Sequence, residues 1–155
     1  MLSYSINSVF DDKAVNELIN ASPTNRMHAN RLVGLIILRD IGKRFDNQGA
    51  PPAKWVDLKE ETIKRRRKGK KTGRGVRILI DDGTLKRSFM PGDKNNLYAT
   101  DANNVVVGTK LIYAAPHQFG FKKLNIPARP MVYSPADLPE LQKQIIAIYK
   151  ERLFK

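Results

Sequence analysis

Hydrophobic positions repeat at helical spacing in the first half of the chain and at shorter, alternating spacing in the second half. The first helix signal combines Phe10 and Asp11 with Val15 four positions inside the following segment. This pattern is typical of a hydrophobic staple around an aspartate N-cap. It predicts a short helix that runs through about Asn20.

A second helix signal follows at once, because Ser22 precedes Pro23 and proline is tolerated at the first helical position. We expect a long helix from there to roughly Phe45. Its middle is apolar around the whole circumference, and a helix of that kind must be covered on every side. It is therefore either a central helix wrapped by a sheet or a helix partly covered by another subunit. These apolar positions are Leu32, Val33, Leu35, Ile36, Ile37, Leu38 and Ile41.

After residues 49–52 end the helical pattern, the charged segment 59–68 predicts a short helix. Four short runs of strand character then follow from position 76 onward. Asp82-Gly83 and Asn103-Asn104 separate them as turn pairs, so the pattern indicates an antiparallel meander. The predicted strands are residues 76–80, 85–89, 97–101 and 105–108.

The last part of the chain returns to helical signals. Residues 113–119 predict a helical turn, and a terminal amphipathic helix begins either at Ser134 or at Asp137. Pro139 favours the later start, because proline cannot donate from the interior of a helix. The fold class is therefore α+β, with about four antiparallel strands packed against the long helix and the terminal helix.

Length and composition narrow the protein class. The chain has 155 residues, which fits a single domain over residues 1–155 with a core that needs no disulfide or metal. It contains no cysteine, so thiolate zinc sites and cysteine nucleophiles are excluded. The longest apolar run, residues 32–38, is too short to cross a bilayer, and the first residues do not resemble a signal peptide. We expect a soluble protein made in the cytoplasm.

Positive charge dominates the chain, since 28 Lys and Arg residues oppose 15 Asp and Glu residues and give a net charge of +13. Much of the excess lies in residues 64–77, which carry no acidic side chain, and we expect a flexible basic loop there. Such a loop is a solvated surface, a docking site for an acidic partner, or a DNA-facing surface. Aromatic stacking residues are absent, which favours the first two options over DNA. The candidate contacts are Lys64, Arg65, Arg66, Arg67, Lys68, Lys70, Lys71 and Arg74.

Candidate catalytic and metal-binding residues are few. His117 has no plausible nucleophile near it in sequence, and His28 has no better claim, so we interpret both as structural. Two histidines without cysteine or a spaced carboxylate cluster do not make a metal site. Asp81 and Asp82 are most simply turn residues. We therefore expect no enzyme activity, no cofactor and no metal.

Several segments in the second half of the chain combine small motifs in a fixed order. A proline pair precedes a tryptophan, a hydrophobic run leads to a glycine turn and Leu-x-x-Ser, and Tyr-Ala precedes His-Gln-Phe-Gly. Ile-Pro-Ala-Arg-Pro then follows and is the most distinctive piece. The residues that carry these motifs include Trp55, Gly83, Leu85, Ser88, Gly108, Tyr113, His117, Gly120, Pro127, Arg129 and Pro130. In this order they resemble the phage virion morphogenesis family, the tail-completion proteins of Mu-type G protein kind.

That resemblance implies a non-enzymatic structural protein of the virion, located at the tail end or neck of a tailed phage or prophage. It would complete the tail, as a tail terminator does, and enable head-tail joining. Its expected partners are further copies of itself in a ring and other tail or neck proteins, with weak DNA contact as a further option and no membrane. Asp82 stands where the family usually has threonine, and the basic loop is unusually dense.

A different function class remains open beside this one, namely a sequence-nonspecific nucleic-acid-binding protein that acts through the basic loop 64–77. It predicts DNA binding that weakens steeply with salt.

Two further expectations concern single side chains. Arg129, held between Pro127 and Pro130, should clamp a carboxylate or a carbonyl within the fold or across subunits. Trp55 and Phe119 should be core anchors.

Overall fold

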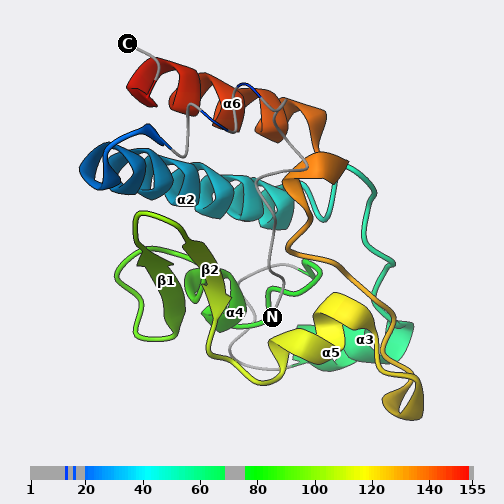
Figure 1. The fold of residues 1–155 in the computed structure, drawn as a ribbon. Helices are drawn as coiled ribbons and strands as arrows, with labels where there is room; N and C mark the ends of the chain where they lie inside the picture. Colours follow the sequence, from blue (N-terminus) through cyan, green and yellow to red (C-terminus); the bar gives the residue numbers. More distant parts are fainter. Residues whose placement is uncertain (1–12, 14–15, 17–19, 69–75, 154–155) are drawn as a thin grey trace. The chain divides into compact units, whose positions relative to one another are not determined.

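The computed structural model describes residues 13, 16, 20–68 and 76–153 (Figure 1). Most of the short helix predicted through Asn20 lies outside them, as does the middle of the predicted basic loop. The chain clusters into two compact units. The first holds residues up to Asp40 together with Leu97–Val107 and the chain from Tyr133 onward, and the second holds Ile41–Asn96 and Gly108–Val132. The single domain expected from the chain length stays a prediction.

The long helix is confirmed as α2, Pro23–Asp46, with 24 residues. Ser22 caps it, because its Oγ accepts a hydrogen bond from the Asn25 backbone N–H at 3.2 Å. The helix ends before Gly49, whose φ of 111° is a left-handed conformation that favours glycine. A Cβ at Gly49 would also lie 2.5 Å from the Trp55 backbone nitrogen. The close approach of the chain after the helix therefore requires glycine at this position.

The first unit is built from the early part of α2, the terminal helix α6 (Pro139–Leu153) and a β hairpin. α2 lies between α6 and the hairpin (Figure 1). Ala29 and Val33 of α2 form one hydrophobic cluster with Leu141 and Ile145 of α6, and Val105 of the hairpin packs against it. The start of α6 at Pro139 confirms the later of the two predicted starts. A short 3-10 helix, η3 (Pro135–Asp137), precedes it.

Polar contacts tie the hairpin and α6 to α2. The Asn30 side chain is buried and donates to the Asp101 carbonyl at 2.8 Å, while its oxygen accepts from the Tyr149 hydroxyl. Burial raises the pKa of Tyr149 to about 12. On the hairpin, the Tyr98 hydroxyl donates to the Arg31 carbonyl at 2.8 Å. Not all of α2 is covered, since Leu35 is 39% exposed.

The sheet is smaller than predicted. It has two strands, β1 (Asn96–Thr100) and β2 (Val105–Thr109), joined by a turn in which the Asp101 carboxylate accepts from the backbone N–H groups of Asn103 and Asn104. The predicted strands at 76–80 and 85–89 are wrong, so the meander of about four strands is wrong as well. Residues 76–80 are turns and irregular chain, and Thr84–Arg87 form the short helix α4. The α+β class is confirmed.

The Asp82-Gly83 pair is not a hairpin turn. Gly83 has φ 81° and caps α4, and the Asp82 carboxylate accepts from the Thr84 N–H at 2.8 Å and from the Thr84 hydroxyl at 2.7 Å. These bonds lower the pKa of Asp82. Aspartate followed by glycine starts a helix here because its side chain bonds the backbone two residues on.

The second unit contains the end of α2, α3 (Glu60–Lys68), α4, α5 (Ala114–Phe119) and a 3-10 helix, η2 (Lys122–Leu124). α3 and α5 confirm the predicted short helix and helical turn. Phe45 at the end of α2 lies between two aromatic rings, with its centroid 5.3 Å from Trp55 at an edge-on angle and 6.0 Å from Phe89. All three rings are buried.

Candidate functional site

The basic stretch predicted from the sequence divides into a described and an undescribed part. Lys64 to Lys68 form the second half of α3, where positive side chains offset the helix dipole, and Glu60 and Glu61 occupy its first turn. Lys64 pairs with Glu60 at 3.7 Å. Lys70, Lys71 and Arg74 lie outside the described residues, so the flexible loop stays a prediction.

Arg66 differs from its neighbours on α3 because it is used inside the fold. Its Nη1 donates to the carbonyls of Arg77 at 2.7 Å and Ile80 at 3.2 Å, and its Nε lies 3.5 Å from an Asp81 carboxylate oxygen. Arg66 therefore ties α3 to residues 77–81. By contrast, Arg65 and Arg67 are exposed, and neither forms an ion pair with any residue that the structure describes.

Arg129 is a buried clamp in the second unit, with 6% of its surface exposed. Its Nε donates to the Val56 carbonyl at 2.8 Å and its Nη2 to the Asp57 carbonyl at 2.9 Å. A clamp on carbonyls within the fold is one of the options that its sequence context left open. Burial lowers the pKa of Arg129, and the nearby Arg66 charge lowers it further, while Asp57 opposes the shift. Arg129 therefore faces repulsion from another guanidinium in a partly dehydrated site.

Gln118 joins α5 to the extended chain that follows Arg129. Its side-chain oxygen accepts from the N–H groups of Met131 at 2.8 Å and Val132 at 3.1 Å, and its nitrogen donates to the Val132 carbonyl at 2.7 Å. Gly120 follows α5 with φ 77° and ψ 162°, where a side chain is strained. A Cβ there would also lie 3.0 Å from the Ala128 nitrogen.

The remaining motif residues of the second unit fall into two groups. Trp55, Leu85 and Ser88 are buried. The Trp55 indole donates to the Pro130 carbonyl at 2.8 Å, and the Ser88 hydroxyl donates to the Leu85 carbonyl at 2.7 Å. Tyr113 is 47% exposed. The expectation of a core anchor holds for Trp55 but is wrong for Phe119, which is 66% exposed because it ends α5 at the surface. Gly108 lies in β2.

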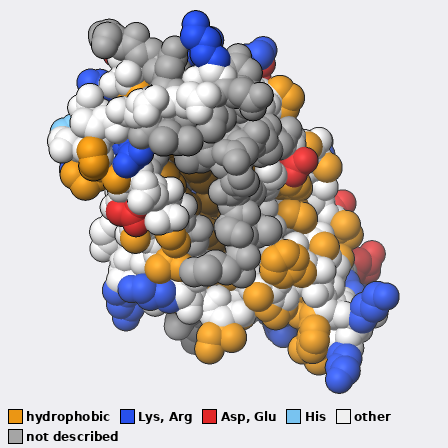
Figure 2. Space-filling model, viewed as in Figure 1, with side chains coloured by type: hydrophobic (Ala, Val, Ile, Leu, Met, Phe, Trp, Pro, Cys, Tyr) orange, Lys and Arg blue, Asp and Glu red, His pale blue; other side chains and the backbone are white. Residues whose placement is uncertain are grey.

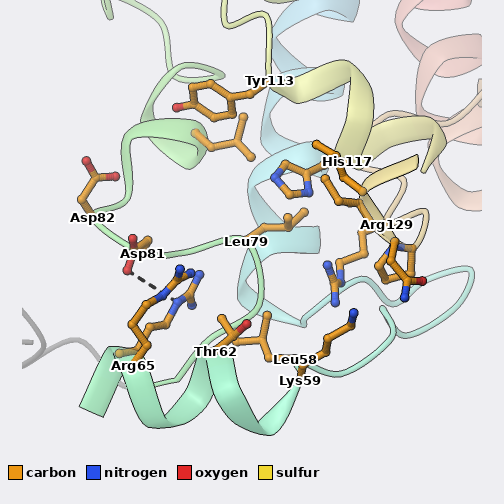
Figure 3. A pocket seen from close by; sticks show the side chains of 16 residues that line it. Leu58, Lys59, Thr62, Arg65, Leu79, Asp81, Asp82, Tyr113, His117 and Arg129 are labelled. Atoms are coloured by element: carbon orange, nitrogen blue, oxygen red, sulfur yellow. Dashed lines mark ion pairs between the residues drawn. The ribbon is translucent and has the colours of Figure 1, made fainter. Parts of the chain in front are cut away.

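A cavity of about 550 Å³ lies within this unit (Figure 3). Thr62 and Arg65 reach it from α3, His117 from α5, and Tyr113 and Arg129 from the segments beside α5. Asp81 and Asp82 lie on the side opposite Arg129 in this view. The lining residues are Leu58, Lys59, Thr62, Arg65, Arg66, Leu79, Asp81, Asp82, Leu85, Tyr113, His117, Leu124, Asn125, Ile126, Pro127 and Arg129. The cavity thus combines cationic groups with an apolar surface.

His117 lines this cavity from α5. Its Nδ1 is buried and has no hydrogen-bond partner in the described part of the chain. Burial lowers the pKa of His117, and the Arg129 charge lowers it further. An imidazole beside the Arg129 guanidinium is poorly suited to bind a cation. Over residues 13, 16, 20–68 and 76–153, no group of three or more His, Cys, Asp or Glu side chains is placed to hold a metal ion.

The sequence did not predict the structural roles of two residues in the second unit, Arg44 and Gln118. Arg44 is 1% exposed, and it donates to the carbonyls of Pro51 at 3.1 Å and Met131 at 2.6 Å. Gln118 was part of a motif without an assigned role. The one available signal for Arg44 was its place next to Phe45 and three positions after Ile41, on the buried face of α2.

None of the helices that the structure describes has the length and apolarity needed to cross a membrane.

Comparison with known proteins gives one family. The model of the phage virion morphogenesis family matches residues 11–150. An uncharacterized protein of Methanocaldococcus jannaschii is 34% identical over 99 residues, which cover 60% of this chain and 68% of that protein. No solved structure matches the chain. The family match extends over both compact units.

Proposed function

Because the chain belongs to the phage virion morphogenesis family, we propose that it is a structural protein of a tailed phage or prophage that completes the tail and thereby enables head-tail joining. The family supports a role in virion morphogenesis, and tail completion is the more specific step proposed here. In this proposal the protein acts at the tail end or neck, in the manner of the Mu-type G protein, without catalysis and without a cofactor.

The observation that carries the proposal is the extent of the family match together with what its motif residues do. Trp55 bonds the Pro130 carbonyl, and Arg129 bonds the Val56 carbonyl, so motif segments about 75 residues apart hold one another. Their role in the fold is to build a scaffold. A residue set that builds a scaffold around a cavity, with no catalytic constellation among the residues that the structure describes, agrees with an assembly component.

Exposed hydrophobic side chains support association with other proteins. In the second unit Ile112 is 90% exposed, Leu124 68% and Phe119 66%. Exposed apolar side chains of this size gain free energy when another protein covers them and removes them from water. We propose that further copies of this chain in a ring, or neighbouring tail and neck proteins, cover them.

The test is electron microscopy of an induced lysate that lacks this reading frame, with the intact gene supplied in trans as control. Filled heads beside unattached or overlong tails, restored to joined virions by the intact gene, are the expected result. Joined virions of normal appearance in the deletion lysate would refute tail completion as the role of this protein.

A further inference from the structure

The cavity of the second unit carries more positive than negative charge. Lys59, Arg65, Arg66 and Arg129 line it against the two carboxylates Asp81 and Asp82. Arg66 pairs with Asp81 at 3.5 Å, whereas Lys59 and Arg65 form no ion pair with a residue that the structure describes. The charges of Lys59 and Arg65 are therefore available to an anionic ligand.

Inside the cavity the cationic groups also repel one another. Burial lowers the pKa of Arg129 and the nearby Arg66 charge lowers it further, so these two guanidinium groups repel one another. Two of the three Arg129 guanidinium nitrogens donate to backbone carbonyls, and its Nη1 makes no hydrogen bond to any described residue. An anion placed here would reduce the repulsion and bond donors that are already fixed in position.

Six of the other lining residues are apolar, beside the polar side chains of Thr62, Tyr113, His117 and Asn125. The apolar residues come from two stretches of the chain. Leu58, Leu79 and Leu85 precede α5, and Leu124, Ile126 and Pro127 follow it. The turn that carries Leu124 is itself mixed, because Lys122 and Lys123 are exposed beside Phe121, which is 40% exposed. In Figure 2 hydrophobic and basic side chains adjoin at the lower right, where Figure 1 places this turn. A purely ionic ligand would leave this apolar surface unused.

From these features we propose that the cavity binds an acidic peptide segment of another virion protein. A carboxylate of the segment would face Arg65 and Arg129, and a neighbouring apolar side chain would lie against Leu58 and Leu124. The volume of about 550 Å³ lies in the range of ligand pockets and suits a segment of a few residues. This proposal rests on the proposed function in one respect, namely that the peptide belongs to another virion protein.

Nucleic acid fits the same cavity less well. Among the lining residues that the structure describes, Tyr113 is the single aromatic side chain apart from His117. Proteins that bind single strands need a positive groove with several aromatic rings for stacking. The mixture of cationic and apolar side chains in the lining favours a peptide.

The first experiment measures fluorescence anisotropy of the full chain with a fluorescein-labelled peptide that alternates glutamate and leucine. A peptide that alternates glutamine and leucine removes the charge, and one that alternates glutamate and serine removes the apolar side chains. We expect each replacement to weaken binding about tenfold, because the cavity uses both kinds of contact. Equal affinity for the glutamate and glutamine peptides would overturn the proposal.

Variants then locate the binding. Arg65→Glu reverses an exposed charge that lines the cavity, and Lys54→Glu makes the same change at an exposed position outside the lining. Leu124→Ser shortens the apolar surface at a residue that is 68% exposed, where the fold tolerates a change. Arg65→Glu and Leu124→Ser should weaken peptide binding about tenfold, and Lys54→Glu should change it less than twofold.

Circular dichroism and thermal unfolding of each variant confirm that the fold is intact. An equal loss of affinity in Arg65→Glu and Lys54→Glu would mean general charge attraction and would overturn the site. Tighter binding of a labelled single-stranded oligonucleotide, lost on Arg65→Glu, would replace the peptide by nucleic acid. If the full chain does not bind the peptide, the proposed cavity ligand is wrong, but the result of the deletion lysate is unaffected. The two proposals can therefore fail separately.

Discussion

Single buried arginines do much of the structural work in the second unit. Arg129 and Arg44 are 6% and 1% exposed, and each donates to two backbone carbonyls. Guanidinium groups are suited to this because they present several donors in a fixed plane and are less strongly hydrated than ammonium groups. A lysine at either position donates all its hydrogens from one nitrogen, so it lacks the two separated donor nitrogens that bond the two carbonyls here.

Arg129→Lys should therefore lower the free energy of unfolding by about 1–3 kcal/mol, the cost of leaving a buried carbonyl without its charged donor. Chemical denaturation followed by tryptophan fluorescence measures it, since Trp55 lies in the same unit. Arg65→Lys at an exposed position is the matched control and should stay within about 0.5 kcal/mol. Equal stability of both variants and the original chain would show that the clamp contributes nothing.

His117 should titrate below its ordinary pKa of 6.5, because burial and the Arg129 charge disfavour the imidazolium. Between the two pKa values the unfolded chain binds more protons than the folded chain. The stability from this group is thus present above about pH 6.5 and is lost as the pH falls through the folded pKa. NMR titration of the imidazole reports the value, and a pKa of 6.5 or higher would contradict the expectation. In His117→Gln the loss of stability toward about pH 5 should be smaller.

The sequence predicted the type of these residues better than their contacts. The prolines around Arg129 indicated a rigid clamp, but the partners at Val56 and Asp57 lie more than 70 residues away and left no local signal. The prediction that Phe119 is a core anchor was wrong for a local reason. An aromatic residue at a motif position predicts burial on average, whereas here it ends a six-residue helix at the surface.

At the scale of elements, helix starts were predictable because they depend on adjacent residues. Ser22 and Pro23 set the start of α2, and Pro139 set the start of α6. The conformation of residues 76–89 was not predictable in this way, because Asp82-Gly83 between hydrophobic runs is also the commonest hairpin signal. Which structure forms depends on Asp82 bonding Thr84 instead of joining two strands, and alternating hydrophobic spacing does not record that choice.

Two glycines of α2 test how tightly this helix is packed. At Gly42 a Cβ would meet no atom within 4 Å, so Gly42→Ala should raise the free energy of unfolding by about 0.5–1 kcal/mol through helix propensity. At Gly34 a Cβ would lie 2.5 Å from the Tyr98 ring, whose hydroxyl bonds Arg31. Gly34→Ala should lower it by about 1–3 kcal/mol.

Thermal and urea unfolding of both variants give the comparison under the same conditions. The same substitution in the same helix should have opposite signs at the two positions, so propensity alone cannot produce the result. If both variants are stabilised, the ring of Tyr98 moves aside at little cost, and the contact between β1 and α2 is looser than the distance indicates.

For the whole molecule, the net charge of +13 predicts association with any polyanion at low salt. We expect weak binding to duplex DNA at about 50 mM salt that is lost near about 200 mM, while the glutamate-leucine peptide should stay bound because part of its affinity is apolar. Anisotropy titrations over this salt range measure both. DNA binding that persists at the higher salt would favour a nucleic-acid function over assembly.

The bonds that join the motif segments have a consequence for how the chain can diverge. In most of them one specific side chain donates to a main-chain carbonyl, as Trp55 does to Pro130 and Arg129 to Val56. Any residue offers a carbonyl, so the donor is constrained while the acceptor position can accept substitution. Among relatives, we expect the donor positions to change rarely and Val56, which is 58% exposed, to vary freely. Divergent sequences can in this way keep one scaffold while the surface they present to neighbouring virion proteins changes.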